Sequence, residues 1–319
     1  MNTVKPLIGL GTAAIGRPQY INVRQEEGAS ISLEEFRNKG RDTLEYAYQN
    51  GIRYFDTAPG YGLAEELLLD WVKTKQDPDI EVATKWGYTY VANFDPTATT
   101  HEIKEHSLTK LNEQWLQSQK LLPYLKIYQV HSATFDSGIL ENEEILKRLY
   151  ELKSKHNLIM GITTTGDNQI EVIKKTLNIV IEGNSLFDAF QVTYNVLDQS
   201  LNDIMDTLKE QHNKVIIKEA LANGRLFPND NYLTYQPLYQ ILQKLADKYK
   251  VGIDAIALRF CIDSIQPYKV LSGAANSDHI TDNLKVSNFT LNTNEIEILK
   301  SFRSKPSEYW EERKKLGWN

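Results

Sequence analysis

Residues 53–62 read Arg-Tyr-Phe-Asp-Thr-Ala-Pro-Gly-Tyr-Gly, a short aromatic run that ends on a charged residue and turns at a Pro-Gly pair. Aromatic residues favour β-strands, and Pro and Gly favour turns. The next short apolar run, Glu81–Lys85, also ends on a charged residue, and a longer helix-like segment separates the two runs. Strands that alternate with helices in this way predict a parallel sheet joined by crossover helices.

The same alternation runs along the whole chain and predicts eight strands. The short runs are Leu7–Thr12, Arg53–Asp56, Glu81–Lys85, Lys126–His131, Met160–Thr164, Ala189–Tyr194, Val215–Glu219 and Lys269–Ser272. Apolar residues at helical spacing mark Leu33–Asn50, Glu141–Lys155, Leu201–Gln211 and Leu238–Lys250. Eight alternations in a chain of this length favour an α/β fold of the closed (β/α)8 TIM-barrel type over an open doubly wound sheet, which is the alternative. We expect a single barrel domain over residues 1–319, with extended loops at Arg17–Leu33 and Trp86–Thr100 and a C-terminal tail after Lys305.

The composition is that of an ordinary soluble globular protein, with 319 residues, a net charge of -6, 41% hydrophobic and 24% charged residues. A mild acidic balance gives no electrostatic reason to bind nucleic acid or an anionic membrane, and no apolar run is long enough for a membrane span. The single Cys261 excludes an internal disulfide and a cysteine-based metal cluster. The N-terminus has no secretory pattern, so we expect a cytoplasmic protein, a monomer or small homo-oligomer.

Four polar residues fall at or just beyond the ends of predicted strands. Asp56, Lys85 and His131 each end a strand, and Tyr61 lies in the loop that follows Asp56. In a barrel, these positions meet at the face where active sites are built. A charged residue at the end of an apolar strand is costly to bury without a partner, so we expect Asp56 and Lys85 to pair.

This set of residue types suggests proton transfer to a carbonyl oxygen. A tyrosine hydroxyl has a pKa of about 10, and a lysine ammonium beside it favours the phenolate and lowers that value. Asp56 would hold Lys85, Tyr61 would give or take the proton, and His131 would donate a hydrogen bond to the same oxygen. Each residue alone has an ordinary alternative. Asp56 could cap a turn, Lys85 could be a solvated strand end, His131 could be a hydrogen-bonded core histidine, and Tyr61 could be an ordinary loop aromatic. The four together at one face favour the catalytic interpretation.

The ordered motifs resemble those of the aldo-keto reductases. They are Gly9-Leu-Gly-Thr-Ala-Ala-Ile-Gly, Tyr54-Phe-Asp-Thr-Ala-Pro-Gly-Tyr-Gly, Thr84-Lys-Trp-Gly, Tyr128-Gln-Val-His, Gly161-Ile-Thr, Phe190-Gln-Val-Thr-Tyr-Asn and Ser272-Gly-Ala-Ala-Asn. They keep the family's order from about Leu7 to Asn283. The resemblance implies a (β/α)8 barrel, a bound NADP or NAD, and a catalytic tetrad of Asp56, Tyr61, Lys85 and His131.

The resemblance also implies residues that hold the cofactor. Gln191 matches a glutamine placed against the nicotinamide carboxamide, and Thr163-Thr164 stands where the family usually has Ser-Asn. Lys218 replaces a tyrosine that often stacks on the nicotinamide, and it could face the cofactor or the substrate or pair with Glu219. Gly224 and Arg225 match a glycine-containing loop near the pyrophosphate, where Gly224 allows close approach and Arg225 could supply charge.

The adenosine end departs from the pattern of many NADP-dependent members. The segment from Ser272 to Asn283 contains no lysine or arginine for a 2′-phosphate and carries two aspartates instead. A doubly charged phosphate without a cation loses its strongest contact. Possible adenosine-side contacts are Ser272, Gly273, Asn276, His279 and Asn283, and Asn276 could equally cap a helix. Family habit favours NADP, whereas this physical argument makes NAD a serious alternative.

Three functions are compatible with such a barrel. An oxidoreductase acting on a small aldehyde, ketone or sugar is favoured by the complete tetrad. A nucleotide-binding regulatory subunit with little turnover would have no need for Lys85 beside Tyr61. A hydrolase or lyase would need a metal set or a carboxylate pair, and the strand ends show no convincing metal spacing. We expect Trp86, Tyr61, His131 and aromatics of the 86–100 loop and the tail (Tyr309, Trp310, Trp318) to line the substrate pocket.

Overall fold

A closed barrel of eight parallel strands forms the centre of the computed structural model, which describes residues 7–17, 32–95 and 97–317. The strands are β1 (Ile8–Gly11), β2 (Tyr54–Asp56), β3 (Glu81–Trp86), β6 (Leu125–Ala133), β7 (Ile159–Thr164), β10 (Ala189–Thr193), β11 (Lys214–Lys218) and β12 (Lys269–Ser272). They hydrogen-bond in chain order, and β12 returns to pair with β1. All eight predicted strands are therefore confirmed, and the open sheet is excluded.

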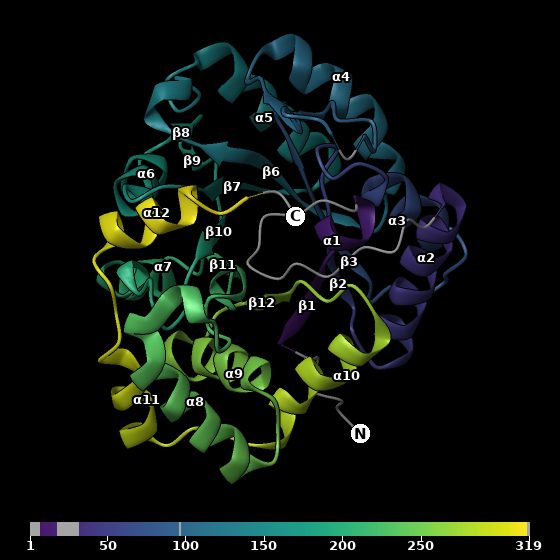
Figure 1. The fold of residues 1–319 in the computed structure, drawn as a ribbon. Helices are drawn as coiled ribbons and strands as arrows, with labels where there is room; N and C mark the ends of the chain where they lie inside the picture. Colours follow the sequence, from purple (N-terminus) through teal and green to yellow (C-terminus); the bar gives the residue numbers. More distant parts are fainter. Residues whose placement is uncertain (1–6, 18–31, 96, 318–319) are drawn as a thin grey trace.

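Helices surround the barrel, as Figure 1 shows. They are α1 (Ala13–Gly16), α2 (Leu33–Gln49), α3 (Ala64–Val72), α4 (Leu108–Ser118), α5 (Glu143–His156), α6 (Gln169–Leu177), α7 (Met205–Glu210), α8 (Gln236–Tyr249), α9 (Ile253–Ile265), α10 (Ser277–Leu284), α11 (Thr293–Lys300) and α12 (Pro306–Lys314). The predicted helix Leu201–Gln211 is divided into a 3₁₀ turn, Ser200–Asp203, and α7, because the backbone leaves helical geometry at Ile204. The other 3₁₀ turns are Gln119–Leu121, Phe135–Ser137, Ala222–Gly224, Asp230–Tyr235 and Lys285–Asn288.

Local sequence explains where several of these helices begin. Ser32 accepts a hydrogen bond from the Glu35 amide, and the Glu35 carboxylate accepts one from the Ser32 amide. This reciprocal capping box satisfies two amides that a helix start leaves without partners. Asn292 and Glu295 form the same arrangement at the start of α11.

The barrel interior follows the period-two alternation of its strands. A buried cluster of Tyr54, Ala83, Ile127, Ala189 and Ile216 takes one residue from each of five strands. Side chains two positions further along each strand lie on the same face. Asp56, Lys85, Gln191 and Lys218 therefore face inward above this cluster, and His131 does so four positions beyond Ile127. The alternation thus gathers polar side chains at the carboxyl ends of the strands.

Two small antiparallel hairpins accompany the barrel, the first near that carboxyl end and the second just before β10, at the amino end of that strand. The predicted loop Trp86–Thr100 contains β4 (Tyr88–Tyr90), which pairs antiparallel with β5 (Glu102–Lys104). A second small hairpin joins β8 (Val180–Ile181) to β9 (Asn184–Ser185). Most of the predicted loop Arg17–Leu33 lies outside the described residues, as does Trp318. Among the helices described, none is long and apolar enough to cross a membrane.

Candidate active site

Asp56 and Lys85 form a buried ion pair at the carboxyl end of the barrel. The ammonium of Lys85 contacts Oδ2 of Asp56 and also donates to the carbonyl oxygen of Thr57, at 3.0 Å. The side chains are 0% and 2% exposed, so water does not screen the pair. The expected pairing of neighbouring strand ends is confirmed.

Tyr61 and His131 lie next to this pair. The Lys85 ammonium is 4.8 Å from the centre of the Tyr61 ring, and the His131 ring meets that ring edge-on, with 5.5 Å between centroids. Gly62 fixes the loop that carries Tyr61: its φ is +63°, and a Cβ there would lie 2.4 Å from the carbonyl oxygen of Gly16. The structure therefore brings all four predicted tetrad residues together.

Gln191 joins the tetrad through its amide. Its Nε2 donates to Oδ1 of Asp56 at 2.7 Å, so both carboxylate oxygens of Asp56 have a partner. The sequence predicts that Gln191 contacts the nicotinamide carboxamide. The structure gives its amide nitrogen a role in fixing Asp56, and the inward alternation of Gln191 on β10 is the signal that points to this role.

The two threonines expected beside the carboxamide also have protein partners. The Thr163 hydroxyl accepts from the amide of Ser132 at 2.7 Å, and the Thr164 hydroxyl donates to Oε1 of Gln169 at 3.2 Å. Both threonines are buried. Thr163 therefore ties β7 to the end of β6, close to His131, and Thr164 ties β7 to α6.

The surroundings of Tyr61 keep its hydroxyl protonated. Burial raises the pKa of Tyr61 well above its ordinary value, Asp56 raises it further, and the charge of Arg17 opposes the rise. The sequence predicts instead that Lys85 lowers this pKa. The difference arises mainly because burial disfavours the charged phenolate, and the nearby Asp56 carboxylate disfavours it further.

His131 is held in its neutral form. Burial lowers the pKa of His131 well below its ordinary value, and the charges of Lys85, Arg17 and Lys218 lower it further. Its Nδ1 is buried and has no hydrogen-bond partner among the described residues. A neutral imidazole carries one N–H, so His131 has the form of a hydrogen-bond donor beside Tyr61.

Arg17 is a residue of this site that the sequence reasoning missed. Its guanidinium donates to the carbonyl oxygen of Gly60 at 3.0 Å and to Glu102 at 2.6 Å, and it lies 5.4 Å from the Tyr61 ring centre. Arg17 is buried, at 3% exposure. It holds the Tyr61 loop against β5, a contact between segments 85 positions apart that no local pattern indicates.

Trp86 does not lie in the mouth of the barrel. It is completely buried, belongs to the core outside the barrel strands and packs against His106 with 5.4 Å between centroids. The expectation that Trp86 lines the substrate pocket is therefore wrong. Because Lys85 faces inward, the next residue on the strand faces outward, and the alternation could have shown this. Tyr88, whose ring centroid lies 4.7 Å from that of His131, is an aromatic residue beside the tetrad.

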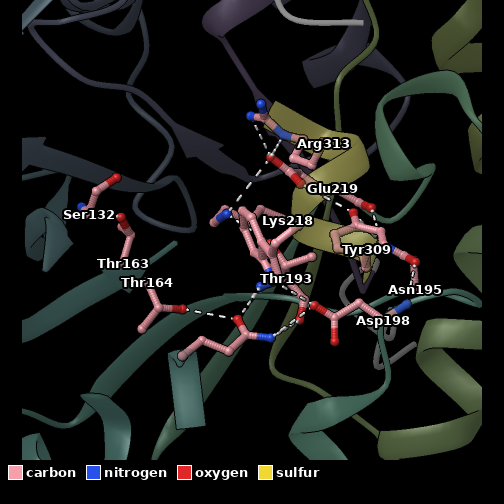
Figure 2. Close-up of polar contacts among 12 residues, drawn as sticks. Ser132, Thr163, Thr164, Thr193, Asn195, Asp198, Lys218, Glu219, Tyr309 and Arg313 are labelled. Carbon is pink, nitrogen blue, oxygen red and sulfur yellow. Dashed lines mark hydrogen bonds and ion pairs between the residues drawn. The ribbon is translucent and has the colours of Figure 1, made fainter. Parts of the chain in front are cut away.

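Lys218 faces the mouth at the end of β11. Its ammonium donates to the Thr193 hydroxyl at 2.9 Å and lies 4.0 Å from Glu219 and 5.6 Å from the Trp310 ring centre. Figure 2 shows Lys218 linked to both Thr193 and Glu219. Glu219 itself is bound by Arg313 of α12 at 3.0 and 3.1 Å. Burial lowers the pKa of Lys218, and Glu219 opposes this effect.

A cavity of about 1200 Å³ lies beside the barrel mouth. Its walls come from α2, the loop after β11, the α8–α9 corner and the segment from Gly273 to Asn283. Five expected cofactor residues line it, namely Gly224, Gly273, Asn276, His279 and Asn283. The four tetrad residues are not among its lining residues. The two features meet at β11, where Lys218 faces the mouth and Glu219 lines the cavity.

The cavity suits a dinucleotide in size and in backbone geometry. Small-molecule sites commonly enclose about 300–1,000 Å³, and this one is larger. A Cβ added at Gly273 would meet nothing within 4 Å, so the backbone there opens onto free space. Ala222, Asn223 and Gly224 all have positive φ values, which is the kind of constrained backbone that gathers at ligand sites. The residues present therefore fit a nicotinamide dinucleotide.

Three expected cofactor contacts have a different position or role. Arg225 is completely buried and binds Glu312 and the carbonyl oxygen of Tyr309, each at 3.2 Å, so it anchors α12 and does not line the cavity. Ser272 is buried and donates to Asn283 at 2.6 Å. Asn276 caps α10 by accepting from the amide of His279 at 2.9 Å, although it also lines the cavity.

The barrel, its polar mouth and the adjoining cavity define a (β/α)8 protein with a small-molecule site at the carboxyl ends of its strands. The sequence profile of the Aldo/keto reductase family matches residues 7–304, and the chain belongs to this family.

Known relatives resemble the chain over most of its length. "Uncharacterized oxidoreductase YqkF" of Bacillus subtilis is 24% identical over 85% of this chain and 90% of its own. "NADH-specific methylglyoxal reductase" of Escherichia coli is 23% identical over 92% of this chain and 93% of its own. Among solved structures, aldo-keto reductase AKR11C1 from Bacillus halodurans in its holo form has a TM-score of 0.69 at 22% identity, covering 93% of this chain and 92% of that one. The structural likeness supports the barrel fold.

Proposed function

We propose that this protein is an NADH-dependent reductase of small aldehydes or ketones, with Tyr61 as the proton donor. The observation that supports this most strongly is the group of Tyr61, His131 and the buried Lys85–Asp56 pair at the barrel mouth, next to a cavity of dinucleotide size. A module that only bound nucleotide would not require a buried ion pair beneath a tyrosine.

The chain's own residues would act on the carbonyl oxygen of the substrate. When bound, the nicotinamide supplies the hydride. Tyr61 is protonated because its pKa is raised by burial, so it can give its proton to the oxygen as negative charge develops there. His131, kept neutral by burial, would donate a second hydrogen bond to that oxygen. Lys85 and Asp56, fixed by Gln191, hold the lower side of the site in one geometry.

The charges along the cavity support NADH over NADPH. Among the described lining residues there is one cation, Lys39 of α2, against four carboxylates, Asp42, Glu219, Asp254 and Asp282, of which Glu219 is paired with Arg313 and Asp282 with Lys285. A 2′-phosphate brings about two further negative charges, which an acidic wall repels and which need cationic partners. The name of the Escherichia coli relative, an NADH-specific reductase, points in the same direction.

The test is a comparison of both reduced cofactors with the purified protein. We expect NADH to bind at least ten times more tightly than NADPH, measured by nicotinamide fluorescence, and to be oxidised when methylglyoxal or another small aldehyde is added. Tyr61→Phe should bind NADH normally and turn over slowly. Binding of neither cofactor would refute the proposed function, and a preference for NADPH would refute the cofactor assignment alone.

A further inference from the structure

Within the described residues, the charged side chains around the barrel mouth do not balance in their ion pairs. Arg17 is paired with Glu102 at 2.6 Å, Lys85 with Asp56, and Arg313 with Glu219 at 3.0 Å. Each of these pairs has one cation and one carboxylate. Lys218 is a fourth cation, and in the described part of the chain its nearest carboxylate is Glu219, at 4.0 Å and already bound by Arg313.

No other carboxyl group in this cluster compensates Lys218 fully. Asp198 accepts hydrogen bonds from the Trp310 indole and from Ser200, and burial raises the pKa of Asp198. A raised pKa favours the uncharged form of a carboxyl group. Lys218 itself is only 20% exposed, so water solvates little of its charge. A cation with little water and a shared counter-ion attracts an anion strongly.

The direction of Lys218 places this attraction inside the mouth. Lys218 lies two positions beyond Ile216, which belongs to the inner cluster, and its ammonium rests on Thr193, two positions beyond Gln191. Gln191 in turn binds Asp56. The ammonium therefore lies one layer above the Asp56–Gln191 contact, toward the carboxyl ends of the strands. Its charge also acts on His131, whose pKa it helps to lower.

We propose that Lys218 forms an anion subsite that binds a carboxylate group carried by the carbonyl substrate. This rests on the proposed reductase function and specifies its substrate class as small aldehydo or keto acids. One ammonium matches one negative charge, so a carboxylate suits the subsite better than a phosphate dianion. The neutral carboxamide of the cofactor would leave the charge of Lys218 uncompensated. Lys218 ends β11, and the described lining of the dinucleotide cavity includes the next residue, Glu219.

The experiment compares matched substrates that share the reacting aldehyde and differ chiefly in whether they carry a negative charge. 4-Carboxybenzaldehyde and its methyl ester share one reacting group, and 4-oxobutanoate and butanal form a second pair. Wild-type protein should reduce the acid of each pair with the higher kcat/KM. Lys218→Met should lower the acid-to-neutral ratio of kcat/KM by roughly 10- to 100-fold, because a hydrogen bond between charged groups is lost. Lys218→Arg should retain most of the preference.

Lys214→Met is the matched control. Lys214 begins the same strand on the same face, four positions earlier, at the opposite end of the barrel, where its ammonium lies over the Tyr268 ring. The Lys214→Met variant should leave the acid-to-neutral ratio of kcat/KM unchanged. The preference of the wild type should also weaken as salt is raised from 0.05 to 0.5 M, on the order of the concentrations that screen partly exposed charges.

A binding measurement separates this inference from the reductase function. Calorimetric titration with benzoate should show binding to wild type and to Lys214→Met, tenfold or more weaker binding to Lys218→Met, and little binding of benzamide to any of them. Equal benzoate affinity in wild type and Lys218→Met, or no benzoate binding to wild type, would overturn the subsite. A loss of NADH affinity in Lys218→Met with an unchanged acid-to-neutral ratio would assign Lys218 to the cofactor instead.

Two further outcomes are decisive. Faster reduction of glyceraldehyde 3-phosphate than of the carboxylic acids would overturn the choice of a carboxylate. If wild type binds benzoate through Lys218 but reduces no aldehyde, the proposed function fails while the anion site stands.

Discussion

Replacing Lys85 by methionine should destabilise the protein by about 3–5 kcal/mol, because it leaves the Asp56 carboxylate buried without its cation. Asp56 is 2% exposed, and the remaining contact from Gln191 is a single amide hydrogen bond of 2.7 Å. A net amide hydrogen bond contributes roughly 1 kcal/mol, which is too little to offset the cost of an unpaired buried charge. The loss is a large part of the 5–15 kcal/mol that typically stabilises a folded protein.

The double variant Asp56→Asn with Lys85→Met should recover at least half of the loss. Asparagine keeps an acceptor for Gln191 and removes the charge, and replacing both members of a buried pair is often nearly neutral. Equilibrium urea unfolding, followed by tryptophan fluorescence, measures the three free energies. Lys153→Met is the comparison, because its ion pair with Asp188 has side chains 21% and 40% exposed, and such pairs contribute about 1 kcal/mol or less.

A Lys85→Met variant within 1 kcal/mol of wild type would refute this reasoning, because it would mean that the Asp56 carboxylate is uncharged or solvated in the folded protein. A double variant no more stable than the single one would show that shape, and not charge, makes Lys85 necessary.

Three other changes test separate parts of the structure. Tyr61→Phe should lower kcat by roughly 10²- to 10⁴-fold and leave NADH affinity within about twofold, as stopped-flow and fluorescence titration would show; normal turnover would remove Tyr61 from the chemistry. Ala275→Arg, on the cavity wall, should shift the ratio of NADPH to NADH affinity toward NADPH by about tenfold or more, and an unchanged ratio would place the 2′-phosphate elsewhere. Burial opposes ionisation of Glu219, but the charges of Lys218 and Arg313 lower the pKa of Glu219 from 4.5 to about 2. The ionised carboxylate therefore contributes roughly 3 kcal/mol to the free energy of unfolding above pH 4.5, and this contribution is lost as the pH falls toward 2. In urea unfolding, the free energy of unfolding of Arg313→Met should therefore fall less than that of wild type between pH 4.5 and pH 2. An identical fall in both proteins would contradict the pairing of Arg313 with Glu219.

The barrel and the tetrad were predictable because both depend on repeated local patterns. Each strand is a short apolar run, and Asp56, Lys85 and His131 mark where three of them reach the same face. Parallel strands must carry their carboxyl ends to one side, so sequence position alone brings these residues together. The same pattern, followed one residue further, would have excluded Trp86 from the mouth, since it must face opposite to Lys85.

The contacts that were not predictable join distant segments through side chains. Gln191 binds Asp56 across 135 positions, Arg225 binds Glu312 across 87, and Arg17 binds Glu102 across 85. Strand periodicity gives the direction of a side chain and not its partner. An arginine such as Arg225 is a residue type that often binds phosphate. Only the position of α12 shows that its guanidinium is instead paired with Glu312.

The C-terminal helix also sets the charge of the mouth. Lys218 and Glu219 are adjacent, and on their own they would compensate each other. Arg313 of α12, 94 positions away, binds Glu219 through two nitrogens, while Tyr309 and Trp310 pack against the same corner. Because one carboxylate cannot fully balance two cations, α12 leaves the positive charge of Lys218 only partly matched among the described residues, at the barrel mouth. The preference for carboxylate-bearing substrates that we propose therefore depends on the C-terminal helix as much as on the barrel. Motifs at the strand ends alone could not have predicted it.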